Sequence, residues 1–241
     1  MRKLLYIPII HTSEDIGSLS KAVTERGISH LGEKVWSEHV ATVHKFWDSI
    51  ADYCASLPAS GMKIYQDGLV ADGEMGAKIV AASALSGSRN YQIVELLRQR
   101  GSEIVKTEDI KLVLEERDRL VATVQARTLV AKIIAVIKYR LIKNKLLDRR
   151  DQFIANRIAE TLADGRTGIL FVGAYHLVRP KLPADIQVVE VKKTELVREY
   201  QTILPFSRHR HQRFAELGRY LAAPVELDLG GPAIGVAGAR V

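Results

Sequence analysis

Two histidines in the sequence each follow an apolar segment, in a pattern that suits acid–base or metal chemistry. His11 comes directly after the apolar run 4–10, and His176 ends the motif G-A-Y-H that follows the apolar run 167–172. Neutral imidazole accepts protons near neutral pH and is also a common ligand of transition metals. We therefore take His176 as a candidate catalytic group, and both histidines as candidate metal ligands.

Carboxylates follow two further apolar segments. Asp67, Asp72 and Glu74 come after the run 62–65, and Glu108 follows the run 103–106. Carboxylates beside imidazoles could complete a divalent metal site, and zinc, manganese, iron and cobalt all accept this ligand set. We choose Glu74 as the third metal ligand and Glu108 as a catalytic carboxylate. The alternative is that all of these residues are ordinary polar strand ends.

Arg150 is the third catalytic candidate, because of its position on a predicted helix. It lies four residues before Ile154, which begins an apolar stripe with Ile158 and Leu162. Residues four apart share one helix face, so Arg150 is expected to face inward. A buried guanidinium needs a carboxylate or an anionic substrate, since an unpaired buried charge is costly. The alternative is that it reaches out to solvent from the helix end.

Short apolar runs alternate with helical stretches along the chain, which indicates how these residues are positioned. The pattern predicts an α/β fold with a parallel or mixed sheet of four to six strands and long covering helices. We expect residues 1–228 to form one α/β domain with long helical insertions, and residues 229–241 to form a flexible glycine-rich tail. In open α/β sheets ligands bind beyond the carboxyl ends of the strands. The candidate histidines and carboxylates all follow strands at that edge.

Two stretches resemble a known family. D-R-R-D-Q-F-I-A-N-R-I-A-E-T-L followed by G-I-L-F-V-G-A-Y-H-L, within residues 148–177, is similar to the carboxyl-terminal signature of TraB/TIKI-like proteins. Their wider superfamily includes ChaN-like and erythromycin-esterase-like proteins. The family pattern is Arg-Asp or Arg-Asn opening a helix, then an apolar strand ending in Gly-x-x-His. Arg150, Asp151, Gly173 and His176 match it in order and spacing.

The resemblance extends to the first strand and implies a function. The family's other Gly-x-x-His ends that strand, where this chain has P-I-I-H, so His11 matches and Pro8 replaces the glycine. The family also uses a glutamate between the motifs, for which Glu74 and Glu108 are both candidates. Membership implies an α/β fold with both histidines in one site. It also implies metal-dependent hydrolysis in some members, metal-free esterase chemistry in others and haem binding in one branch. We therefore predict a hydrolase that acts on an amide or ester, with or without a metal ion.

A concentration of positive charge supports a different function. The formal net charge is +7, and from Leu120 to Arg150 eight lysines and arginines accompany a single acid, Asp148. A basic helix over residues 127–150 could bind nucleic acid or another acidic partner through phosphate contacts. The alternative function is therefore a non-catalytic regulatory or binding protein. Aromatic residues make up only 6% of the chain, and no nucleic-acid motif accompanies the basic residues.

The same helical region predicts self-association. Its apolar positions between Leu120 and Leu147 cover more of the helix than one sheet face requires, so we expect a homodimer or higher oligomer. The alternative is that the helices predicted within residues 18–57 and 74–100 cover it within one chain. Cys54 is the single cysteine, which favours a reducing, cytoplasmic location. The sequence contains no run of about 18 apolar residues, so we expect no membrane span.

Overall fold

The computed structural model describes residues 1–12, 14–15, 20–115 and 129–226, and the side chains of the same residues except those of 129–143. Five strands form one sheet in the order β3-β2-β4-β1-β5, and every pairing is parallel. The strands are β1 (Arg2–Ile9), β2 (Lys63–Gln66), β3 (Glu103–Val105), β4 (Thr167–Gly173) and β5 (Ile186–Glu190). The α/β fold predicted from the alternating pattern is confirmed.

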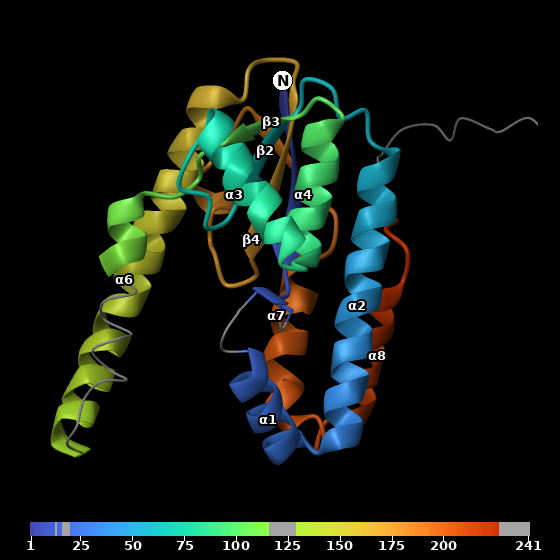
Figure 1. Ribbon diagram of the computed structural model, residues 1–241, viewed down its shortest axis with the longest axis vertical. Coiled ribbons are helices and arrows are strands. Elements are labelled where there is room, and N and C mark those ends of the chain that lie inside the picture. Colours follow the sequence, from blue (N-terminus) through green and yellow to red (C-terminus); the bar gives the residue numbers. More distant parts are fainter. Residues whose placement is uncertain (13, 16–19, 116–128, 227–241) are drawn as a thin grey trace, which may run out of the picture.

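Helices cover both faces of the sheet. They are α1 (Ser20–Leu31), α2 (Glu33–Ser56), α3 (Gly73–Leu85), α4 (Arg89–Gln99), α6 (Leu129–Thr161), α7 (Thr194–Ile203) and α8 (His211–Ala222). The short 3-10 helices η2 (Arg179–Lys181) and η3 (Leu204–Phe206) lie in the connections. Figure 1 shows α6 on one side of the molecule, with α4, α2 and α8 on the other.

The two faces of β1 bury different sets of residues, because successive side chains of a strand point to opposite sides. Leu5, Ile7 and Ile9 pack in the core formed with α2, α4, α7 and α8. Leu4 and Tyr6 pack in the smaller core formed with α6. β1 and β4 are central strands and are almost continuously apolar, as expected of strands buried on both faces.

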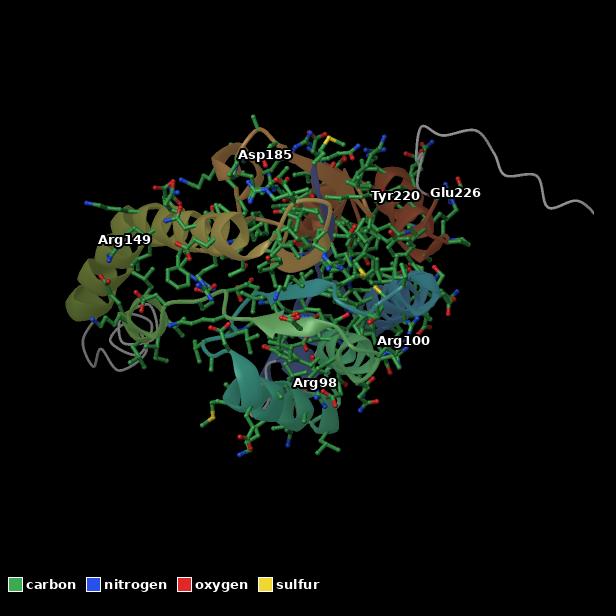
Figure 2. The ribbon with its side chains drawn as sticks, turned by 90° about the horizontal axis from the view of Figure 1, so that it is seen from above. Arg98, Arg100, Arg149, Asp185, Tyr220 and Glu226 are labelled. Carbon is green, nitrogen blue, oxygen red and sulfur yellow. The ribbon has the colours of Figure 1, made fainter. Side chains whose placement is uncertain are left out.

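Helix α6 positions part of the candidate site. No glycine or proline interrupts residues 109–162, and α6 runs without interruption from Leu129 to Thr161. Ile154, Ile158 and Leu162 are all at most 2% exposed and pack on the sheet, as the apolar stripe predicts. The other end of α6 projects beyond the carboxyl ends of the strands (Figure 1). Figure 2 shows Arg149 on this outer part of α6. Arg98 on α4 and Tyr220 on α8 lie at a distance from it, on helices that cover the opposite face of the sheet.

Several predictions fall partly or wholly outside the described part of the chain. The predicted tail 229–241 lies there, and so do most of the side chains between residues 120 and 147 on which self-association depends. Self-association therefore stays a prediction. Among the described helices, none combines the length and the apolar character that a membrane crossing requires.

Candidate active site

The parallel order of the sheet brings the candidate residues to one edge. β2, β4 and β1 are neighbours, and β3 lies beside β2, so the residues that follow these four strands meet beyond their carboxyl ends. In Figure 1, β1 runs downward from the amino terminus, and this edge is at the lower end of the sheet. His11 follows β1, Asp67 follows β2, Glu108 comes shortly after β3, and His176 comes shortly after β4. Helix α6 adds Arg150 and Asp151.

Arg150 joins two carboxylates at this edge. Its Nε donates to both carboxylate oxygens of Glu108 at 3.1 Å, and its Nη2 donates to Glu108 Oε1 at 2.7 Å and to Asp67 Oδ1 at 2.9 Å. The Arg150 side chain is 15% exposed, and Glu108 is fully buried. Arg150 thus faces the sheet, and two carboxylates share its guanidinium. Charge-assisted contacts of this kind fix geometry as well as adding stability.

His176 lies between two further carboxylate contacts. Its Nδ1 donates to Asp151 Oδ1 at 2.5 Å, while the backbone N–H of Leu177 donates to Asp151 Oδ2 at 2.8 Å. On the other side of the ring, Nε2 lies 3.4 Å from Asp67 Oδ2. The imidazole is 7% exposed. Asp67 therefore contacts Arg150 through one oxygen and faces His176 with the other.

Gly173 allows this close arrangement. Its backbone N–H donates to Asp67 Oδ2 at 3.2 Å. A Cβ at this position would lie 3.3 Å from His176 Cδ2, which is tight, and 3.5 Å from Asp67 Oδ2, which is ordinary contact, so a larger residue would press against the imidazole. The G-A-Y-H motif thus begins with glycine because the backbone, the imidazole of His176 and the carboxylate of Asp67 approach one another closely here.

The charges of the cluster perturb its proton equilibria in different directions. Burial alone would lower the pKa of His176, but its contacts with Asp151 and Asp67 outweigh burial and raise this pKa to about 9. Burial alone would raise the pKa of Asp67, but His176 and Arg150 hold it well below its usual range. Burial raises the pKa of Glu108 to about 7 despite its contacts with Arg150. At neutral pH, His176 is therefore an imidazolium and Asp67 a carboxylate.

His11 is more open to solvent than His176. Its side chain is 62% exposed, and Nδ1 lies 3.7 Å from Asp15 Oδ2. Asp15 is itself held in place: it accepts from the Thr12 backbone N–H at 2.7 Å and from the hydroxyl of Ser88. Asp15 raises the pKa of His11, and burial opposes this effect. The charge of Asp67 also raises this pKa, whereas the charge of His176 lowers it. His11 thus belongs to the same electrostatic environment as the buried cluster.

Glu74 does not join the other candidates. It lies in the first turn of α3, where its side chain is 85% exposed and forms an ion pair with Lys78 at 3.0 Å. The carboxylate that this loop contributes to the cluster is Asp67, seven residues earlier. The expectation that Glu74, His11 and His176 form one ligand set is therefore not supported by their placement.

The placement of the charged groups also indicates whether the described residues could hold a metal ion. Among the described residues, no three His, Cys, Asp or Glu side chains are arranged so that they could hold one. The guanidinium of Arg150 already lies against two of the carboxylates, Asp67 and Glu108. The described residues therefore do not fit a three-ligand centre. Zinc, manganese, iron or cobalt binding stays a prediction.

Sequence reasoning missed several groups of the site. Asp151 stands next to Arg150 in the resembled motif, and that adjacency was the available signal. Two tyrosines lacked any signal. The pKa of Tyr6 is raised by burial and by the charge of Asp151, and burial and the charges of Asp67, Asp15 and Glu108 raise the pKa of Tyr91 to about 12. Both phenols therefore lie within the electrostatic range of the carboxylates.

The basic segment 127–150 is only partly described. Lys145 is exposed, and Arg149 forms an ion pair with Glu115 at 3.3 Å. Arg150 belongs to the buried cluster and is not part of a basic surface. The other basic side chains of the segment, those of residues 127–143, lie outside the described ones. Nucleic-acid binding through this segment stays a prediction.

Comparisons of the sequence and structure with models of known protein families, with curated proteins and with solved structures find no match. The likeness to TraB/TIKI-like proteins thus stays a resemblance on the residues named above.

Proposed function

We propose that this protein hydrolyses an ester or amide bond by direct attack of water, with His11 as general base and His176 as a charged hydrogen-bond donor. The observation that supports this is the pairing of each histidine with its own aspartate at one edge of the sheet. The contacts at Nδ1 are His11–Asp15 and His176–Asp151. An acid–base pair needs two titratable groups whose different environments give them different pKa values, so that one can be charged while the other is neutral.

His11 has the features of a general base. The carboxylate of Asp15 faces Nδ1 and favours the tautomer that carries its proton there, which leaves Nε2 to take a proton from water. When the ester or amide bond then breaks, the protonated ring of His11 returns this proton to the leaving alcohol or amine. The exposed ring can reach both water and a bound substrate. Asp15 raises the pKa of the ring, which makes the deprotonated ring a stronger base.

His176 has the features of an electrostatic stabiliser. It carries a positive charge at neutral pH, and its Nε2 lies 3.4 Å from Asp67, longer than a good hydrogen bond. Because the contact with Asp67 is long, the Nε2–H can be shared with the oxygen on which negative charge develops as water adds to a carbonyl. Preorganised donors of this kind typically lower the barrier by several kcal/mol, about 3 for a single donor.

Arg150 and Glu108 are positioning residues in this mechanism. Arg150 fixes Asp67 through Oδ1, and Asp67 in turn faces His176 through Oδ2. Glu108 is fully buried and does not contact the substrate. It holds the other side of the guanidinium, so the charged ring of His176 is oriented by a chain of three contacts.

The pH dependence of hydrolysis tests these roles. We expect kcat/KM for p-nitrophenyl acetate to rise with pH as His11 loses its proton, and to fall near pH 9 as His176 loses its own. Asp15 raises the pKa of His11, so Asp15→Asn lowers that pKa and shifts the acidic limb to lower pH. The alkaline limb stays in place. Rates after dialysis against EDTA and after addition of zinc or manganese test the metal-dependent form of the prediction.

Asp48→Asn is the matched control for this experiment. Asp48 forms an exposed ion pair with Arg89 and is not part of the cluster. Its replacement should move neither limb. An acidic limb that stays in place in Asp15→Asn, or that moves equally in both variants, would contradict the assignment of His11 as base.

A further inference from the structure

We propose that the cavity beside His11 is the subsite for a neutral, apolar acyl chain of the substrate. This inference rests on the proposed hydrolysis and names the class of substrate. The cavity has a volume of about 360 Å³ and lies between α1, α2 and the start of η3. In Figure 1, α1 lies below the carboxyl end of β1 and beside the lower half of α2.

The position of the cavity connects it to the site. His11 and Thr12, which directly follow β1, both line it. The exposed imidazole of His11 therefore lines the cavity and also lies within electrostatic range of Asp67 and His176. A carbonyl carbon attacked by water from His11 would have its acyl chain at the opening of this cavity.

The lining indicates an apolar occupant. Its walls include Val23, Trp36, Val40, Val43 and Leu204, and no described lining residue is a lysine or arginine. Glu14 is the carboxylate among them, and it is exposed. An anionic acyl group would lose hydration here, and away from His11 the described walls offer it no lysine or arginine.

His39 also lines the cavity and adds no charge. Its Nδ1 contacts the hydroxyl of Tyr200 at 3.0 Å, and burial lowers its pKa to about 4. The ring is therefore neutral at physiological pH. His39 therefore does not attract an anionic ligand.

Thr12 contributes a second observation. It is 8% exposed, and its hydroxyl oxygen is buried without a hydrogen-bond partner among the described residues. Buried hydroxyls are nearly always partnered, so a partner supplied by a ligand would explain this one. Next to His11, the natural candidate is an oxygen of the ester or amide group. At about 30 Å³ for a water-sized group, the cavity of about 360 Å³ has room for roughly ten to twelve such groups.

A chain-length series tests the inference. With p-nitrophenyl esters from acetyl to decanoyl, kcat/KM should increase by up to roughly fourfold per methylene and level off once the cavity is filled. Val23 is 43% exposed on α1, so a tryptophan there can fill the cavity without disturbing the core. We expect Val23→Trp to reduce the ratio of octanoyl to acetyl activity at least tenfold. Ile28→Trp, on the same helix but outside the lining, is the control and should leave this ratio unchanged.

A binding measurement separates this inference from the proposed function. The neutral ketone 2-dodecanone is not hydrolysed, and its binding should change the tryptophan emission of the wild-type protein but not of Trp36→Phe. Binding without hydrolysis of any ester would support the subsite and contradict the proposed reaction. Hydrolysis that is independent of chain length, with no binding of the ketone, would overturn the subsite and leave the reaction standing.

Discussion

Replacing His11 with asparagine is expected to lower kcat/KM for p-nitrophenyl acetate by about 10²- to 10⁴-fold, the usual contribution of a general base. Asparagine keeps a polar side chain of similar size but cannot accept a proton from water at neutral pH. The His11 side chain is 62% exposed, so its replacement should leave the melting temperature nearly unchanged. Steady-state kinetics and thermal unfolding of the same preparation measure both quantities.

His209→Asn is the control for this variant. His209 is an exposed histidine between η3 and α8. Its replacement should change neither kcat/KM nor stability. If His11→Asn retained full activity, or if both variants lost activity equally, His11 would not be the base.

Replacing Arg150 with methionine is expected to lower the free energy of unfolding by about 3–5 kcal/mol, the usual effect of removing one partner of a buried ion pair. The variant loses the contacts to Asp67 and Glu108 and leaves both carboxylates without a neighbouring guanidinium. Methionine keeps much of the aliphatic length of arginine, so lost packing contributes little. Urea unfolding followed by circular dichroism measures the change.

Arg149→Met is the matched control, since the two arginines are adjacent on α6. The Arg149 side chain is 54% exposed and pairs with Glu115 at the surface. Exposed ion pairs contribute at most about 1 kcal/mol, so the control should remain close to the wild type. Equal losses in the two variants would mean that the buried cluster does not stabilise the fold through Arg150.

The fold was predictable because its signals are local. Apolar runs mark all five strands, and the alternation with helices specifies a sheet with helical cover. The inward face of Arg150 was predictable from its spacing to Ile154. That His11 and His176 lie at one edge follows from the rule that ligands bind beyond the carboxyl ends of parallel strands.

Which side chains contact one another within the site was less predictable, because these contacts depend on the order of the strands in the sheet. Asp67 and Glu74 both follow β2, but the residue directly after the strand reaches the cluster, whereas α3 carries Glu74 out to solvent. Tyr91 comes near the cluster from α4, although α4 and β4 are far apart along the chain. Burial, which raises the pKa of Glu108 to about 7, depends on packing that no local pattern encodes.

Titration of the histidine ring protons by NMR tests the account most directly, because it needs no substrate. His176 should titrate with a pKa of about 9, His11 above its ordinary value, and His39, as an internal reference, at about 4. Asp151→Asn should lower the pKa of His176 alone, and Asp15→Asn that of His11 alone. Ordinary values near 6.5 for both His11 and His176, unaffected by these substitutions, would contradict the proposed acid–base pair.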